Sequence, residues 1–111
     1  MQSNQFRSVD EALKKITVDK NTAIVTLTHD PKLDDPALEY SLKTNAFYIG
    51  CLGSKKTHDS RILRLKKKGI NEDQLKKLNG PIGLSIGAKT PSEIAISIIS
   101  QVILFKNTAN A

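Results

Sequence analysis

The chain has 111 residues, a hydrophobic fraction of 39% and a formal net charge of +6, which fits a single domain over residues 1–111 with a core of its own. The chain has no tryptophan and only three Phe and two Tyr residues, so its core must be aliphatic. The polar start does not resemble a secretory signal, and the longest apolar stretch, residues 94–105, is too short to span a bilayer. We therefore expect a cytoplasmic protein with no membrane-embedded part.

The positive charge is concentrated in one segment. Residues 53–79 contain nine cations and only three anions, so this segment carries the whole excess and the rest of the chain is neutral. The nine cations are Lys55, Lys56, Arg61, Arg64, Lys66, Lys67, Lys68, Lys76 and Lys77.

The first half of the chain predicts two helices and a strand. A capping-box spacing and a shared apolar face predict a short helix over residues 8–16. A run of β-branched residues predicts a strand over 22–28. We expect the next helix over 33–44, with Asp34 or Asp35 as its cap and a proline in its first turn.

A strand, a glycine turn and a basic helix start follow one another over residues 46–57. The apolar run over 46–52 predicts a strand that is buried on both faces. The single cysteine, Cys51, lies inside this run, so we expect a buried thiol and not a nucleophile or a metal ligand. Glycines, helix amides and nearby lysines suit an anion; the alternative is a plain connection in which Ser54 only caps the helix.

The second half predicts three helices and one more strand. Helices are expected over residues 57–68, with all its cations pointing outward, and over 71–78. Small and apolar residues alternate over 81–89, which indicates a short strand leading into a loop. A strong helix-start pattern then predicts an apolar helix over 91–105 that needs to be covered on more than one side. We expect the tail, 107–111, to be disordered.

Strands that alternate with helices predict an α/β fold with a parallel sheet and right-handed crossovers. Ligands of such sheets bind at the carboxyl ends of the strands. Polar clusters lie at all three of these ends and are expected to converge, which favours a binding site. The candidate binding residues are His29, Asp30, Gly53, Ser54, Lys55, Lys56, Thr57, Lys89 and Thr90.

Three blocks of sequence resemble a known family. They are Thr-Leu-Thr-His-Asp-Pro-Lys-Leu-Asp-Asp-Pro-Ala-Leu over residues 26–38, Tyr-Ile-Gly-Cys-Leu-Gly-Ser-Lys-Lys-Thr over 48–57, and Gly-Pro-Ile-Gly-Leu followed by Gly-Ala-Lys-Thr-Pro-Ser-Glu-Ile-Ala over 80–95. In this order and spacing they are similar to the xanthine dehydrogenase accessory factors of the XdhC/CoxI type. The resemblance covers the chain from about residue 8 to 104.

This resemblance implies a three-layer, Rossmann-like domain with a parallel sheet of about three strands and flanking helices. Members of the family are thought to bind the molybdenum cofactor and to deliver its sulfurated form to a molybdenum hydroxylase. By analogy, the turn over 53–57 would bind a phosphate or a pterin, and His29 and Asp30 would line the same cleft. The implied partner is a molybdenum hydroxylase or one of its subunits.

The chain also departs from the family pattern. No strand pair with a Gly-rich turn precedes residue 22 and no G-x-G-x-x-G occurs, so we expect only the back half of the Rossmann domain and no NAD or FAD site of the usual kind. Ser85 stands where the family usually has an acidic residue. The strand over 22–28 would then be an open edge, so we predict that a second copy, or a chain supplying the missing half, covers it, with the helix over 91–105 as a second contact surface.

Other functions remain as alternatives. His29 and Asp30 are candidates for an acid–base pair, but a turn in which Asp30 caps a helix is favoured, and no nucleophile or metal cluster joins them. We therefore expect a binding protein and not an enzyme. The basic residues over 57–79 permit nucleic-acid binding, although this segment lacks aromatic residues, and a truncated family member without ligand binding is the third alternative.

Overall fold

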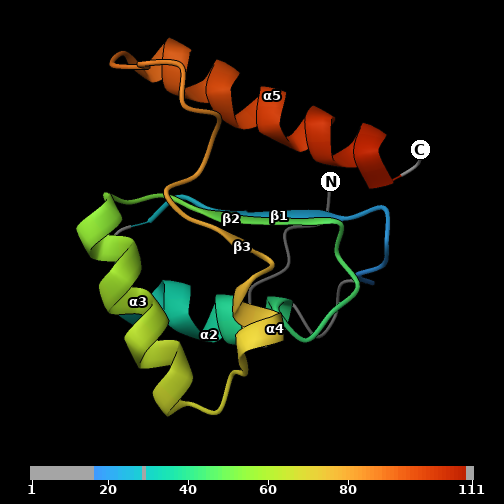
Figure 1. The fold of residues 1–111 in the computed structure, drawn as a ribbon, viewed down its shortest axis with the longest axis vertical. Helices are drawn as coiled ribbons and strands as arrows, with labels where there is room; N and C mark the ends of the chain where they lie inside the picture. Colours follow the sequence, from blue (N-terminus) through green and yellow to red (C-terminus); the bar gives the residue numbers. More distant parts are fainter. Residues whose placement is uncertain (1–16, 29, 110–111) are drawn as a thin grey trace, which may run out of the picture.

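The computed structural model describes residues 17–28 and 30–109, and within them three short parallel strands form one sheet in the order β1-β2-β3. Helices lie on both faces of this sheet: α5 covers one face, and α2, α3 and α4 lie on the other (Figure 1). The predicted three-layer α/β arrangement is therefore confirmed. The elements are β1 (Ala23–Thr26), α2 (Pro31–Ser41), β2 (Tyr48–Cys51), α3 (Lys55–Lys67), α4 (Glu72–Leu75), β3 (Leu78–Asn79) and α5 (Pro91–Ala109).

The main hydrophobic core lies between the sheet and the helices α2 to α4. Because side chains alternate along a strand, Ile49 and Cys51 of β2 point to this face. Both are buried, as the apolar run predicts, and the surrounding helices contribute most of the other core side chains. The core cluster consists of Leu38, Leu42, Ile49, Cys51, Leu65, Ile70, Leu75 and Leu78.

The opposite face of the sheet is covered by α5 alone. Tyr48 points to this face and its ring packs edge-on against Phe105, with 5.3 Å between the ring centroids. On the outer side of α5, three isoleucines at helical spacing, Ile96, Ile99 and Ile103, are each more than half exposed. The helix is therefore covered on one side only among the described residues, although its sequence is apolar nearly all round. None of the described helices has both the length and the apolarity that crossing a membrane requires.

The third strand was predicted in the wrong place. It is formed by Leu78 and Asn79, which pair with Ile49 and Gly50 of β2, and not by residues 81–89. Those residues form an irregular loop instead. Pro81 has no amide hydrogen to donate to a strand ladder, and the loop's glycines turn the chain away, since Gly83 has a φ of +97° and Gly87 a φ of +72°.

Two helix ends also differ from the prediction. Asp30 caps α2 by accepting a hydrogen bond from the Lys32 amide at 3.0 Å, whereas Asp34 and Asp35, the predicted caps, are buried inside the helix. Helix α5 continues to Ala109 because neither glycine nor proline interrupts it, so the prediction of a disordered tail is wrong for residues 107–109. Residues 110–111 and the helix predicted over 8–16 lie outside the described residues.

The cations of α3 do not all point outward. Arg61 is only 2% exposed and lies under the sheet edge, and Arg64 forms a bidentate pair with Asp35 of α2. The prediction of a fully solvated basic face was therefore wrong at these two positions. Buried carboxylates on α2 attract both guanidinium groups inward. The sequence alone does not show that these carboxylates lie opposite α3.

Candidate functional site

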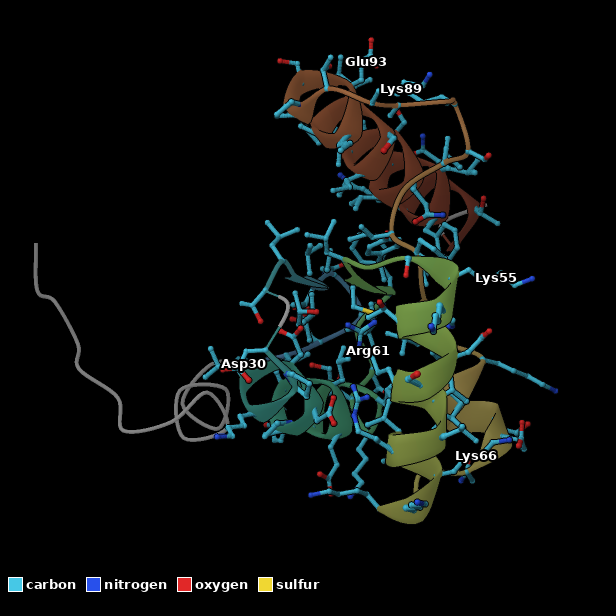
Figure 2. All side chains as sticks on the ribbon, turned by 90° about the vertical axis from the view of Figure 1, so that its left-hand side faces the viewer. Asp30, Lys55, Arg61, Lys66, Lys89 and Glu93 are labelled. Carbon is cyan, nitrogen blue, oxygen red and sulfur yellow. The ribbon has the colours of Figure 1, made fainter. Side chains whose placement is uncertain are left out.

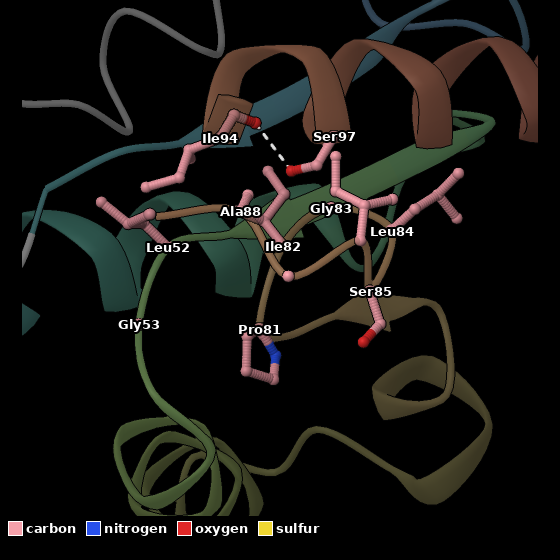
Figure 3. Close-up of a pocket in the computed structure, with 12 residues that line it drawn as sticks. Leu52, Gly53, Pro81, Ile82, Gly83, Leu84, Ser85, Ala88, Ile94 and Ser97 are labelled. Carbon is pink, nitrogen blue, oxygen red and sulfur yellow. Dashed lines mark hydrogen bonds between the residues drawn. The ribbon is translucent and has the colours of Figure 1, made fainter. Parts of the chain in front are cut away.

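A hollow of about 500 Å³ lies at the carboxyl ends of β2 and β3, beside the first turns of α5 (Figure 3). Its size is within the range of pockets that hold small molecules and cofactors. One wall is the turn after β2, and the other is the irregular loop between β3 and α5. The lining residues are Leu52, Gly53, Pro81, Ile82, Gly83, Leu84, Ser85, Ile86, Gly87, Ala88, Ile94 and Ser97.

Helix α5 fixes the start of the loop wall. The Gly83 amide donates to Gln101 Oε1 at 3.0 Å, and the Leu84 amide donates to the Ser97 carbonyl at 3.1 Å. Gln101 Oε1 also accepts a hydrogen bond from the Tyr48 hydroxyl of β2. A Cβ atom at position 83 would lie 2.4 Å from Ser97 Oγ, so only glycine lets the loop approach the helix this closely.

The far part of the loop presents backbone donors that pair with nothing in the described part of the chain. The four consecutive amides of residues 85–88 have no hydrogen-bond partner within residues 17–28 and 30–109. Ser85 and Gly87 both line the hollow. Successive unpaired amides in a curved loop form a concave surface that attracts anions.

The turn after β2 forms the opposite wall. Gly53 lines the hollow with a φ of +148°, and α3 begins two residues later. Ser54 caps this helix, since its Oγ accepts the Thr57 amide at 3.1 Å, as the plain-connection alternative required. Lys55 and Lys56 are exposed in the first turn, where their charges add to the partial positive charge of the helix end.

The other described candidate residues are not among those that line the hollow. Figure 2 shows Asp30, Lys55 and Lys89 on separate elements. Thr90 caps α5 by accepting the Glu93 amide at 3.2 Å, while Glu93 Oε1 accepts the Lys89 amide at 3.0 Å. Asp30 is likewise a helix cap. Of the predicted site residues, only Gly53 lines the hollow directly, and His29 lies outside the described residues.

Sequence reasoning missed the buried polar groups beneath the site. Arg61 donates to Cys51 Sγ at 3.0 Å. Burial raises the pKa of the Cys51 thiol, and the neighbouring Arg61 charge offsets this only in part, so the thiol is neutral at neutral pH. The sequence offers no signal for this arrangement, because Arg61 and Arg64 meet Asp34 and Asp35 across two helices that are far apart in the chain.

His58 is a second residue that the sequence did not single out. It lies near the start of α3 and packs directly against Gly80. A Cβ atom at position 80 would lie 2.1 Å from His58 Nδ1. Burial, together with the charge of Arg61, lowers the pKa of His58, so its imidazole is neutral at neutral pH. Within the described residues there is no group of three or more His, Cys, Asp or Glu side chains arranged to hold a metal ion.

The parallel sheet with helices on both faces defines a Rossmann-type α/β domain. A model of the family described as the XdhC Rossmann domain matches residues 1–102. The chain therefore belongs to the XdhC Rossmann-domain family, which confirms the resemblance found in the three sequence blocks.

Several proteins are similar to this chain. It is 31% identical over 109 residues to the uncharacterized protein YqeB of Escherichia coli and 29% identical over 85 residues to the molybdenum cofactor insertion chaperone PaoD of the same organism. These matches cover 98% and 77% of this chain but only 19% and 27% of the relatives. The chain thus spans about a fifth to a quarter of the length of these curated relatives.

A xanthine dehydrogenase appears in both kinds of comparison. The chain is 29% identical over 94 residues to a probable xanthine dehydrogenase subunit of Bacillus subtilis, covering 85% of this chain and 26% of that protein. A solved structure of a xanthine dehydrogenase from Bacillus halodurans superposes with a TM-score of 0.72 at 34% identity, covering 90% of this chain and 28% of that one. The Rossmann-like fold is thereby confirmed.

Proposed function

We propose that this domain binds the molybdenum cofactor, as cargo, in the hollow between the turn after β2 and the loop between β3 and α5, and assists its transfer to a molybdenum hydroxylase. The observation that carries the proposal is the hollow itself, because two glycine-containing walls meet there at the carboxyl ends of parallel strands. The name of the relative PaoD, a molybdenum cofactor insertion chaperone, supports the same cargo.

The residues present suit an anionic pterin. The lining combines apolar side chains with backbone amides and the hydroxyls of Ser85 and Ser97, which can pack against a flat ring and hydrogen-bond to its edge. The amides of residues 85–88, which have no hydrogen-bond partner among the described residues, and the exposed ammonium groups of Lys55 and Lys56 suit a phosphate. In this proposal the domain only binds the cofactor and passes it on, so no side chain has to act as a nucleophile or other catalytic group.

The basic segment gives less support to a nucleic-acid site than its composition suggests. Three of its nine cations are paired with carboxylates: Arg61 with Asp34, Arg64 with Asp35, and Lys66 with Glu72 at 2.8 Å. The charge available to a phosphate backbone is reduced accordingly. We therefore retain cofactor binding as the proposal.

The proposal can be tested by titrating the protein with molybdenum cofactor under anaerobic conditions. Replacing Lys55 and Lys56 together with alanine removes two charges beside the hollow and should weaken binding about tenfold, ~1.4 kcal/mol. The matched control replaces Lys67 and Lys68, two exposed cations at the other end of α3, and should leave affinity within about twofold. No binding by the unaltered protein would refute the proposal, and equal loss in both variants would reduce it to unspecific charge attraction.

We further propose that a second copy of this chain, or the partner protein, covers the β1 edge and the outer side of α5. Two features support this. Within the described residues β1 pairs with β2 on one side only, and Leu27, the residue after the strand, is 58% exposed. Open apolar edges are normally covered. Sedimentation of the isolated chain at micromolar concentration should show a dimer, or a complex once the hydroxylase is added; a monomer under both conditions would contradict this part of the proposal.

A further inference from the structure

The buried guanidinium of Arg61 lies beneath the turn that forms one wall of the hollow. Its Nη1 donates to Cys51 Sγ at 3.0 Å and its Nη2 donates to the Leu52 carbonyl at 3.2 Å. Cys51 is the last residue of β2, and Leu52 directly precedes Gly53. The two hydrogen bonds therefore hold the backbone at the point where the chain leaves the sheet and turns along the hollow.

A second set of contacts links the same guanidinium to the end of β1. Arg61 Nη2 lies 3.8 Å from Asp34 Oδ2 of α2, and Asp34 Oδ1 accepts a hydrogen bond from the Thr28 hydroxyl at 2.7 Å. Thr28 lies just beyond β1. Both charged side chains are almost completely buried. One buried ion pair thus connects the ends of β1 and β2 with α2 and α3, and in Figure 2 Arg61 points inward from α3 toward α2.

This ion pair is a costly way to pack an interior. Removing two charges from water costs several kcal/mol per ion, and apolar residues of similar volume often serve stability as well or better. The pair also leaves polar capacity unused, since Arg61 Nε and Asp34 Oδ2 are buried without a hydrogen-bond partner among the described residues. Stability alone therefore does not account for a charge at this position.

Arg64, one turn further along α3, provides an internal comparison. Its Nε and Nη2 donate to the two carboxylate oxygens of Asp35 at 2.7 and 3.2 Å, so it also connects α3 with α2. It is more exposed than Arg61, and none of its hydrogen bonds reaches β2 or the turn. The two arginines thus share the task of joining the helices, and only Arg61 contacts the wall of the hollow.

We propose that Arg61 is a positioning residue for cofactor binding. It fixes the carbonyl of Leu52 and thereby the conformation of Gly53, whose φ of +148° brings the chain along the hollow. The space around this turn is already tight, because a Cβ atom at Gly53 would lie 3.1 Å from Thr57 Cγ2 and 3.7 Å from Arg61 Nη1. The identity of the ligand in this inference rests on the proposed function. The choice of Arg61 rests on its hydrogen bonds to Cys51 and Leu52.

The test compares two substitutions of Arg61 with one of Arg64. Arg61→Lys keeps a charge opposite Asp34 but cannot reach both Cys51 Sγ and the Leu52 carbonyl. Cofactor affinity should therefore fall at least tenfold, while the folding equilibrium constant measured in urea should fall by a smaller factor. Asp34→Asn with Arg61→Met removes both charges, so no charge is left buried alone, and it should show the same loss of affinity. Arg64→Met, the control, should retain affinity within about twofold.

A second readout does not depend on the cofactor. In the ligand-free protein, the backbone NMR signals of Gly53 and Ser54 should move or broaden in Arg61→Lys and stay in place in Arg64→Met. Unchanged signals, or full affinity in Arg61→Lys, would overturn the positioning role. If the unaltered protein binds no cofactor, the proposed function fails, and the two amide signals alone then decide whether Arg61 orders the turn.

Discussion

The two faces of the sheet are built differently. The face toward α2, α3 and α4 is a closed core in which Leu38, Leu42 and Leu65 are completely buried and two ion pairs join the neighbouring helices. The face toward α5 is covered by a single helix whose outer side remains more than half exposed at Ile96, Ile99 and Ile103. The closed face therefore holds most of the buried apolar side chains of the described residues, while the open face borders the hollow.

The largest expected difference lies between a core residue of the closed face and an outer residue of the open face. Leu65→Ala leaves a cavity next to β2 and should cost about 2–5 kcal/mol of unfolding free energy. Ile99→Ala removes a side chain that is already 57% exposed in the single chain, so at protein concentrations too low for the chain to associate it should change the unfolding free energy by no more than about 0.5 kcal/mol. Urea denaturation of both variants measures the difference; similar losses would show that α5 is as tightly packed as α3.

The next effect concerns the contact between α5 and the loop wall. Gly83→Ala places a Cβ atom where Ser97 Oγ lies and also strains a residue with a φ of +97°. We expect a loss of about 1–3 kcal/mol, together with weaker cofactor binding because the loop must move away from the helix. Gly69→Ala is the control, since its φ of +93° is similar but no atom lies within 4 Å of the added Cβ. Equal cofactor affinity in both variants would show that the position of the loop does not affect cofactor binding.

A smaller effect is expected at the hydroxyl of Tyr48. Tyr48→Phe removes the hydrogen bond to Gln101 Oε1 and should cost about 0.5–1.5 kcal/mol, while Gln101 keeps the Gly83 amide. Burial is the main reason that the pKa of Tyr48 is raised to about 12. The native state therefore retains this proton more tightly, so the contribution is fully present below pH 10 and is lost as the pH rises toward 12.

Denaturation of the unaltered protein and of Tyr48→Phe at several pH values between 9 and 12 checks this prediction. Lysine titration affects both proteins and cancels in their difference. The two curves should converge as the pH rises. A constant difference would mean that the buried hydroxyl does not titrate differently in the two states.

The smallest effect concerns His58. Burial lowers its pKa from the usual 6.5, so the native state favours the neutral ring. Its contribution to stability is fully present above pH 6.5 and is lost as the pH falls through the lower pKa of the folded protein. Urea denaturation between pH 7 and 5 measures how the unfolding free energy falls as the pH is lowered. This fall should be smaller in His58→Gln than in the unaltered protein. His29 is present in both proteins, so its titration cancels in the comparison. An equal fall in both proteins would contradict the prediction.

The sequence predicted the elements that depend on local signals. Ser54 was named as a cap and is one in the structure, and Asn71 and Thr90 cap the helices predicted over 71–78 and 91–105. Such starts are predictable because capping requires only residues a few positions apart. The alternation of strands and helices likewise predicted the parallel sheet. Strand β3 was missed since it is only two residues long and forms by pairing with β2, a partner that local periodicity does not reveal.

The candidate site was predicted less completely, for a related reason. The sequence located Gly53 and the start of α3, but the wall over residues 82–88 acquires its shape from Gln101 and Ser97 on α5. The inward position of Arg61 also depends on Asp34, which lies 27 positions away in the chain and pairs with it across two helices. Such long-range contacts set the geometry of the site, and no spacing rule in the sequence encodes them.

The most direct test of cofactor binding is to follow the backbone amide signals of the protein by NMR during addition of molybdenum cofactor. Binding in the hollow predicts that the signals of Gly53 and of residues 85–88 move together and saturate, while those of residues 66–77, at the other end of α3 and in α4, stay in place. Movement confined to the lysines of residues 66–77, or no movement at all, would contradict the account.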